Sequence, residues 1–367
     1  MTPQLHGILF AYRDNPHLRE LTTHRTVASI PFGGRFRMID FMLSNMVNAG
    51  IDDIGVVMQE KCQSLLDHLG SGKDWDLARK RGGLRVLPPF NNSGTFRGKM
   101  EALQNVYSYV NEIRQDYVVM ADGDVACNLD LQKVFDQHIA TGADITAVCT
   151  PKYSGDPQVS TYFKADADGR VIDVLDGPHT AEGLESLKVY ILSTKKLVEL
   201  VDYCASHNLY SFTAAILLAK KDELKIQTYL FDGYVARLTS VASYYARSME
   251  LLLEEVGKDL FDLAHPIRTK DRSDPSTFYS PDAKVTNSLV ADGCIIEGTV
   301  EDCVIFRGVH VAKDAVVRNC VLMQDTVVEE GANIRHVIAD KNVTIKAHRT
   351  LAGHMSYPLA IDKLSII

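Results

Sequence analysis

A six-residue period in the last third of the chain restricts its fold more than any other feature of the sequence. Short β-branched patches alternate there with turn-forming pairs such as Asp-Gly, Glu-Gly and Lys-Asp. This pattern predicts a parallel β-helix, in which six residues form one face of a triangular coil and the apolar position points inward. The apolar residues at this spacing are Val290 and Ile296, then Ile305, Val311, Val317 and Met323, then Val328 and Ile334.

The period slips near residues 298–304 and again near 323–328, so the sequence leaves the coil boundaries loose. A small antiparallel sandwich is the alternative that such short strands leave open. If the β-helix forms, its exposed end and flat faces offer surfaces for contacts between subunits.

The front part of the chain alternates short apolar runs with helix-like stretches. Strands that alternate with helices favour a mainly parallel sheet covered by helices. The first expected helix, at 37–50, has one apolar face and Gly50 at its C-terminal end. The expected strands are Gly7–Ala11, Ile54–Met58, Tyr117–Ala121 and Asp144–Cys149, and a second helix is expected at Glu101–Ile113.

Length and local composition indicate two domains. A chain of 367 residues exceeds the usual size of one hydrophobic core. The segment His265–Pro275 is polar, contains two prolines and has no apolar period, as a linker does. We therefore expect an α/β domain at 1–255, a linker at 256–276 and a β-helix at 277–367.

Composition excludes several classes of partner. A net charge of −8 provides no basic field, so neither nucleic acid nor an anionic membrane is expected as a partner. No apolar run approaches the roughly 20 residues that cross a bilayer. The start MTPQLHGILF has no basic region before a 7–15-residue apolar stretch, so we expect no secretory signal. Seven scattered cysteines without a C-x-x-C pair suggest reduced, buried thiols. A soluble cytoplasmic protein with small-molecule or protein partners is expected.

The segment after the first strand lacks what a phosphate cradle needs. Nucleotide-binding α/β domains place a glycine-rich loop there, whose N–H groups bind phosphate. No glycine occurs between Gly7 and Gly33, and Pro16 has no N–H. Side chains and a proline hinder the left-handed turns and the close backbone approach that a polyphosphate requires.

Residues 24–51, HRTVASIPFGGRFRMIDFMLSNMVNAGI, closely resemble the corresponding segment of glucose-1-phosphate adenylyltransferases, also called ADP-glucose pyrophosphorylases. The resemblance covers nearly the whole chain. It implies a Rossmann-like nucleotide-diphospho-sugar transferase domain followed by a left-handed parallel β-helix. Further matches are Gln59, Arg97-Gly98, Gly123-Asp124, Gly233-Tyr234, Tyr244-Tyr245 and the hexapeptide tail.

The resemblance also implies candidate site residues in the front domain. Gln59, Gly98 and Gly123 are candidates for substrate binding. Asp124 matches an aspartate that holds magnesium in the catalytic members, and here it is a vestigial catalytic and metal-binding candidate. Asp124 could instead end a strand as a solvated carboxylate, which is the interpretation that we favour, and we expect no residue of this chain to be clearly catalytic.

Five departures from the family pattern affect the same reaction. The family's G-G-x-G-x-R-L loop is replaced by Ala11–Leu18, and its G-T-A-D-A segment by Gly98–Ala102. Val27 and Gly177 stand at positions where the family has lysines, and Arg237 stands where it has the second aspartate that holds magnesium. Adenylyl transfer joins two polyanions and needs a divalent ion and cationic side chains around the phosphates. Without these groups the chain is expected to be inactive or weakly active, and to require no cofactor itself.

This pattern resembles one branch of the family, the GlgD-type subunits that accompany catalytic GlgC-type subunits in some bacteria. The resemblance implies a regulatory subunit of a hetero-oligomer, expected to be tetrameric, that serves glycogen synthesis, with Mg²⁺ needed by the catalytic partner. Self-association through the β-helix is the other assembly. An active adenylyltransferase using Asp124, Arg13 or Lys99, and a hexapeptide acyltransferase using His310, His336 or His348, are the alternatives.

Basic residues remain in the front motif and in the tail. In the family, anionic sugar-phosphate effectors bind between these regions, where arginine forks suit phosphate. Solvated surface charge or salt bridges between subunits would explain the same residues without an effector. The effector-binding candidates implied by the resemblance are His24, Arg25, Arg35, Arg37 and Arg335.

Overall fold

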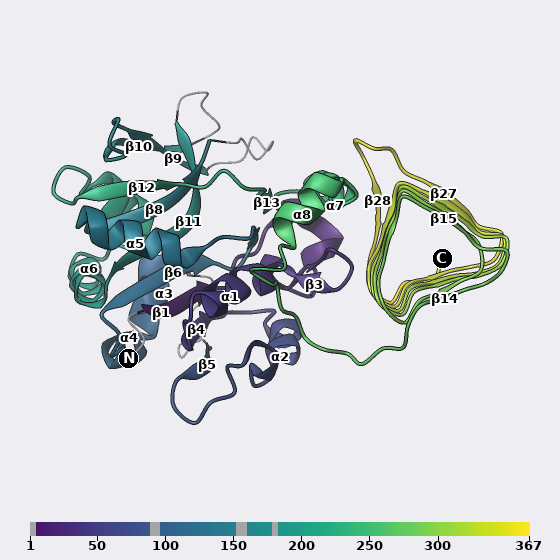
Figure 1. Cartoon of the computed structure of the whole chain (residues 1–367), viewed down its shortest axis with the longest axis horizontal. Coiled ribbons are helices and arrows are strands. Elements are labelled where there is room, and N and C mark those ends of the chain that lie inside the picture. The colour runs from purple at the N-terminus through teal and green to yellow at the C-terminus, as the bar shows by residue number, and fades with distance from the viewer. Residues whose placement is uncertain (1–4, 89–95, 152–159, 178–182) are drawn as a thin grey trace.

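A computed structural model describes residues 5–88, 96–151, 160–177 and 183–367 (Figure 1). Figure 1 shows a helix-covered sheet on one side and a triangular stack of short strands on the other, with α7 and α8 between them. The chain therefore has the expected architecture: an α/β nucleotidyltransferase-type domain followed by a left-handed parallel β-helix. Among the described residues, no helix has the length and apolarity needed to cross a membrane.

The front sheet is parallel around its first strand. β1 pairs in parallel with β4 and β6, so Phe10, Val57 and Asp122 end at the same edge. The strand order is β10-β9-β11-β6-β1-β4-β5, and β8 joins β11 to β12. β11 runs antiparallel to β6, β8 and β9. The strands are β1 Leu5–Phe10, β4 Asp53–Val57, β5 Gly83–Leu87, β6 Tyr117–Asp122, β8 Ile145–Thr150, β9 Ser160–Ala165, β10 Val171–Gly177, β11 Leu184–Ser193 and β12 Ile226–Leu230.

Helices cover both faces of this sheet. Side chains of a strand alternate between faces. Ile8 and Phe10 accordingly pack with α3, α4 and α6, whereas Leu9 packs with α1, α2 and α5. The helices are α1 Met38–Asn48, α2 Gln63–Leu69, α3 Lys99–Asn105, α4 Tyr107–Glu112, α5 Leu131–Thr141, α6 Thr194–Ser206, α7 Val241–Glu250 and α8 Glu254–Leu260.

The second expected helix is wrong as a single element, because it divides into α3 and α4. Val106 leaves helical geometry with φ −113° and ψ 31°. It is almost completely buried, and the sequence has neither glycine nor proline there. The break directs Tyr109 toward β1, where its hydroxyl lies 2.5 Å from His6 Nε2. A tertiary contact thus overrides the continuous local pattern.

The C-terminal domain consists of three sheets of five parallel strands, which form the faces of a triangle. One face contains β14 Phe278–Tyr279, β17 Ile295–Ile296, β20 His310–Val311, β23 Val327–Val328 and β26 Thr344–Ile345. The second contains β15 Lys284–Thr286, β18 Thr299–Glu301, β21 Val316–Arg318, β24 Asn333–Arg335 and β27 Thr350–Ala352. The third contains β16 Leu289–Val290, β19 Val304–Ile305, β22 Val321–Leu322, β25 Val337–Ala339 and β28 Leu359–Ile361.

The six-residue expectation is wrong by one position at Met323. Ile305 pairs with Leu322, so successive coils there are 17 residues apart rather than 18. Leu322 consequently points into the β-helix interior, and Met323 packs in a different apolar cluster, between the domains. A corner that is shorter by one residue moves every following apolar position.

A shared apolar core joins the two domains. Tyr244 and Tyr245 of α7 pack with Val304, Val321 and Ile338 on the outside of the third β-helix face. The boundary expected between residues 255 and 256 falls inside α8. Val256 and Leu260 of this helix belong to the same apolar cluster between the domains. Residues 261–277, all of them described, form no helix or strand.

Alanine substitutions at two glycines test how tightly β4 is packed. A methyl group at Gly55 in β4 would overlap the Tyr109 hydroxyl, whereas Gly257 in α8 has open space around the corresponding position. We predict that Gly55→Ala destabilises the protein by about 1–3 kcal/mol through overpacking. The control Gly257→Ala should stabilise it by about 0.5–1 kcal/mol, since alanine favours a helix. Urea unfolding measures both, and equal stability of the two variants would contradict this packing.

Candidate functional site

The loop after β1 is closed by its own hydrogen bonds. The Asn15 side chain accepts a hydrogen bond from the His17 backbone N–H at 3.1 Å and begins a 3₁₀ helix over Pro16–Thr22. The Val27 N–H donates to the carbonyl oxygen of Arg13 at 3.1 Å, and the Val27 side chain is buried in the interdomain core. The backbone here forms a compact turn rather than an open phosphate cradle.

Two carboxylates at the end of β6 are each paired with a cation. Asp124 Oδ2 lies 2.8 Å from Arg13 Nη1, and the Asp124 side chain is almost fully buried. Asp122 Oδ1 lies 2.8 Å from Lys99 Nζ. Arg13 and Lys99, which could have contacted phosphate, therefore neutralise carboxylates of their own chain. Asp124 Oδ1 is buried without a hydrogen-bond partner, but no group of three or more side chains that could hold a metal ion surrounds it among the described residues, so the residues present do not fit a magnesium site.

Arg237 lies beside this pair. It belongs to β13 (Ala236–Arg237), which pairs with β7 (Val125–Ala126) directly after Asp124. Its guanidinium lies 3.1 Å from Glu185 Oε1 and donates to the carbonyl oxygen of Ser186 at 2.5 Å. Both charged side chains are buried. The residue that the resemblance places at the family's second aspartate is thus a buried cation with its own carboxylate partner.

Lys188 adds a further positive charge beside Asp124, Arg13 and Arg237. It stands in β11 with φ +57°, a left-handed conformation that is uncommon for a residue with a side chain. Burial and the neighbouring charge of Arg13 lower the pKa of Lys188 to about 8. Burial by itself would raise the pKa of Asp124, but the charges of Arg13 and Lys188 outweigh it and the net shift is downward.

The three expected substrate-binding residues lie in different surroundings. Gly98 lines a cavity of about 390 Å³ together with Arg13, Lys99 and Lys188, and its Cα packs against the backbone of Tyr210. The Gln59 side chain accepts a hydrogen bond from the backbone N–H of Phe96 at 3.2 Å. The Gly123 N–H donates to the carbonyl oxygen of Phe10 at 2.9 Å. Of the three, only Gly98 lines this cavity.

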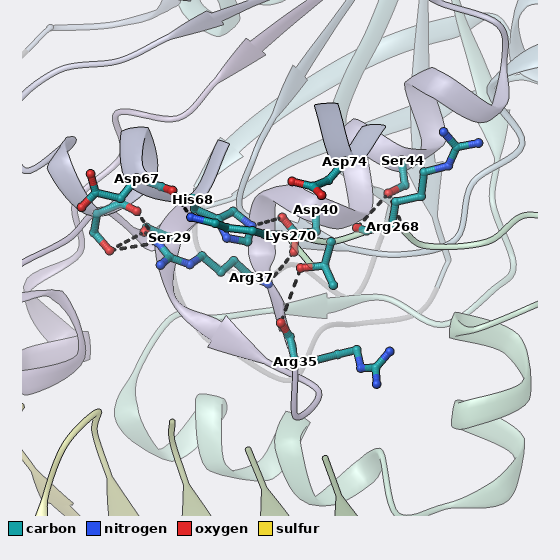
Figure 2. A network of polar contacts seen from close by, with 12 residues as sticks. Ser29, Arg35, Arg37, Asp40, Ser44, Asp67, His68, Asp74, Arg268 and Lys270 are labelled. Carbon is teal, nitrogen blue, oxygen red and sulfur yellow. Dashed lines mark hydrogen bonds and ion pairs between the residues drawn. The ribbon is translucent and has the colours of Figure 1, made fainter. Parts of the chain in front are cut away.

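The expected basic residues of the effector site divide into separate groups. Arg25 is only 2% exposed and pairs with Asp340, just after β25, while its Nη1 is buried without a hydrogen-bond partner among the described residues. Arg37 donates to the Ser29 hydroxyl at 2.6 Å, and Figure 2 shows it running beside His68 toward Ser29. Arg35 points the opposite way in Figure 2. Its guanidinium pairs with Asp292.

Lys341 joins Arg25 and Arg37 between the domains. Burial, together with the positive charges of Arg37 and Arg25, lowers the pKa of Lys341 to about 6. Two charged arginines of the front motif and a lysine of the β-helix that is largely neutral near pH 7 therefore share one partly buried region, with Asp340 as the nearby carboxylate. Such a cluster has the charge and donors to bind a phosphate group.

The other two candidates lie apart from this cluster. His24 Nε2 is 3.8 Å from Asp362 Oδ2 and is exposed. Arg335 is exposed on β24, next to His336, whose Nδ1 lies 2.7 Å from the Tyr245 hydroxyl. Of the other histidines considered for acyl transfer, Nε2 of His310 is 3.0 Å from Glu297, and His348 is exposed after β26.

Sequence reasoning missed Lys188 and Lys341. Lys188 is the only basic residue in the apolar run of β11, which was a usable sign of a buried charge. Lys341 follows Asp340 in a stretch that has the composition of an ordinary coil turn. Its position shows only when the β-helix is docked against the front domain.

The Asp124–Arg13 pair has a testable pH dependence. Because the folded-state pKa of Asp124 lies below its ordinary value of 3.8, the pair stabilises the fold above that pH, and this contribution is lost as the pH falls through the folded-state pKa. We predict that Asp124→Asn costs about 1–3 kcal/mol at pH 7, since Arg13 is partly exposed. The difference from wild type should shrink below about pH 4.

Chemical unfolding at several pH values measures this contribution. The exposed pair of Asp14 and Lys61, with 2.7 Å between its charged atoms, provides the matched control. Asp14→Asn should cost less than about 1 kcal/mol. Equal losses in the two variants at pH 7 would show that burial of the Asp124 pair contributes nothing.

Comparison with known proteins agrees with the two-domain architecture. Residues 16–247 match the nucleotidyl transferase family, and residues 276–354 match a GlmU-like C-terminal hexapeptide family. The chain is 35% identical to "Glycogen biosynthesis protein GlgD" of Bacillus subtilis strain 168, over 98% of this chain and 96% of that protein. A protein of the same name from Geobacillus stearothermophilus is 35% identical over 86% of this chain and 84% of the relative.

A "Glucose-1-phosphate adenylyltransferase" of Geobacillus stearothermophilus is 33% identical over 85% of this chain and 82% of the relative. Both kinds of relative thus match across most of their length. The chain belongs to the nucleotidyl transferase family, in the glucose-1-phosphate adenylyltransferase group of glycogen biosynthesis, and within that group it is of the GlgD type.

Proposed function

We propose that this chain is a regulatory, non-catalytic or weakly active subunit of ADP-glucose pyrophosphorylase. It assembles with a catalytic homologue that makes ADP-glucose and pyrophosphate from ATP and glucose 1-phosphate for glycogen synthesis. The observation that carries this proposal is the pairing of Asp122 and Asp124 with Lys99 and Arg13 at 2.8 Å each. The carboxylates that would bind a metal are each paired with a cation that would otherwise bind phosphate, although Asp124 Oδ1 keeps no hydrogen-bond partner among the described residues.

The charges around this pair support the same conclusion. Arg237 replaces a carboxylate with a positive charge, and Lys188 adds another beside it. A divalent cation approaching Asp124 is repelled by these charges, and burial leaves little water to screen the repulsion. The chain therefore lacks the main groups that would position the two phosphates and neutralise their charge during catalysis.

An active adenylyltransferase with substituted residues is the second candidate. The cavity lined by Arg13, Lys99 and Lys188 favours it, because bound ATP could draw these cations away from their carboxylates. The two candidate functions differ in whether the isolated chain converts ATP and glucose 1-phosphate to ADP-glucose and pyrophosphate.

A turnover assay separates them. With ATP, glucose 1-phosphate and Mg²⁺, we expect the purified chain to release pyrophosphate at least about 10³-fold more slowly than a catalytic homologue. Added to that homologue, it should raise the rate by about fivefold or more. Heat-denatured chain is the control for non-specific protein effects. Rapid turnover by the chain alone would establish the second candidate and contradict the first.

The cluster of Arg25, Arg37 and Lys341 supports an effector role for the same subunit. The buried, unpartnered Nη1 of Arg25 and the partly neutral Lys341 can each gain a hydrogen bond and charge compensation from a phosphate group. A sugar phosphate bound there would contact both domains. His24, Arg35 and Arg335 contribute less in this arrangement, because each lies outside the cluster.

Substitution of Lys341 tests the effector role. In the assembled enzyme, Lys341→Gln should raise the sugar-phosphate concentration for half-maximal activation by about tenfold. Anion binding should raise the pKa of Lys341 above about 6. Wild type should therefore bind the effector more tightly as the pH falls from 8 toward 6, and the Lys341→Gln variant should not show this trend. Lys313→Gln, at an exposed β-helix lysine, is the control. Unchanged activation of the Lys341 variant would remove the role.

A further inference from the structure

The cavity that Gly98 lines has a positive lining in an acidic protein. Its volume of about 390 Å³ lies near the lower end of the roughly 300–1,000 Å³ of small-molecule sites, so it suits one small molecule rather than two substrates. The chain has a net charge of −8, whereas the lining contains four cations and two carboxylates. These are Arg13, Arg97, Lys99 and Lys188, with Asp122 and Asp176. The charge of the cavity therefore favours an anion.

Lys188 is the cation of this lining that lacks a close partner. The other three each lie within 2.6–2.8 Å of a carboxylate oxygen: Lys99 of Asp122, Arg13 of Asp124 and Arg97 of Glu101. Among the described residues, none accepts a hydrogen bond from the Lys188 ammonium group or forms an ion pair with it. The charges of Asp122 and Asp124 act on this group only from a longer distance. Its charge and its hydrogen-bond donors therefore remain available to a ligand.

The backbone of β11 is distorted where it presents Lys188. The pairing of β11 with β8 shifts register between Ser186 and Val189, as it does in a β-bulge. Lys188 lies inside this irregularity with φ +57°, and its backbone N–H donates to the Ser186 hydroxyl at 3.0 Å. Bulges next to active sites often redirect a side chain, and a left-handed backbone is strained for a residue such as lysine. Because such strain concentrates at functional sites, the distortion indicates that this ammonium group serves a ligand.

We propose that Lys188 makes this cavity a metal-independent binding site for a small phosphate monoester. Such an ester carries about −1.5 to −2 charges at pH 7, which metal-dependent transferases compensate with a divalent ion. The described part of the chain has no group of three or more side chains that could hold such an ion. An ammonium group fixed by β11 supplies positive charge in its place and has three hydrogen-bond donors for the phosphate oxygens.

The remaining lining suits the organic part of a monoester. Its aromatic side chains are Phe10, Tyr12, Phe96 and Phe212, and its hydroxyl-bearing residues include Ser160, Thr161, Ser211 and Thr213. Apolar walls with a few polar groups are typical of small-molecule sites. Asp124 is not part of the lining, and its Oδ2 pairs with Arg13, so its charge opposes an anion less than that of a lining carboxylate would.

The inference goes beyond the proposed function, which requires no ligand at this centre. It also differs from the second candidate function, in which ATP and Mg²⁺ bind together for turnover. A subunit that transfers no adenylyl group keeps, in this interpretation, a ligand site where the front sheet ends.

Calorimetric titration of the full chain with glucose 1-phosphate, in EDTA and again in Mg²⁺, tests the proposal. All titrations use Lys341→Gln as the background, because this substitution weakens phosphate binding between the domains. Affinity should be equal within about twofold in the two buffers, and Lys188→Met should lower it by about tenfold or more, since it removes charged hydrogen bonds. Lys133→Met, at an exposed lysine of α5, is the matched control and should leave the affinity unchanged.

A second variant, Lys188→Gly, separates ligand binding from a structural role. Glycine adopts φ +57° without strain, so this variant should unfold at the same or a higher temperature than Lys188→Met, yet lose affinity to the same extent. A folded Lys188→Gly chain that keeps the affinity of the background would overturn the inference, as would binding that requires Mg²⁺.

Inorganic phosphate is the further probe, because it lacks the organic part. It should bind more weakly than glucose 1-phosphate, and equal affinity would overturn the choice of a monoester. The titrations contain no ATP and measure no turnover, so their failure is distinct from failure of the assay that tests the proposed function.

Discussion

The contact between α7 and the third face of the β-helix is the interaction on which the rest of the molecule depends. Tyr244 and Tyr245 bury their rings against Val304, Val321 and Ile338, and burial of each large apolar side chain contributes about 1.5–3 kcal/mol. This contact fixes the β-helix against the front domain. The buried pair of Arg25 and Asp340 lies at the same interface, where the cost of desolvating two charges offsets much of their attraction.

The front domain keeps the scaffold of a nucleotidyl transferase while its centre satisfies its own charges. Parallel strands still bring Phe10, Val57 and Asp122 to one edge. At that edge, Arg13 and Lys99 bind carboxylates of the same chain. The fold therefore persists without the groups that the reaction uses, since packing maintains the scaffold and function resides in individual sites. A chain of this kind can still offer its surfaces and its interdomain cations to a partner or an effector.

Both domains of the fold could be predicted from the sequence because their patterns are local. The strands of the parallel half end within two residues of their expected positions, and Gly50 has the positive φ of a residue that follows a helix. The expectations failed where a distant contact decides. The helix breaks at the buried Val106, and the break directs Tyr109 to His6 of β1. In the β-helix, a coil of 17 residues places Leu322 in the interior instead of Met323.

For the site, the sequence by itself determined which groups are present: it has no glycine between Gly7 and Gly33, and it has Val27, Gly177 and Arg237 at the positions where the resemblance to the family implies two lysines and an aspartate. Only the tertiary structure decided how the remaining charges pair. Arg13 and Asp124 are 111 residues apart, and Arg25 and Asp340 are 315 apart. Periodicity acts over a few residues, whereas the position and pKa of a buried charge depend on groups that folding brings together from the whole chain.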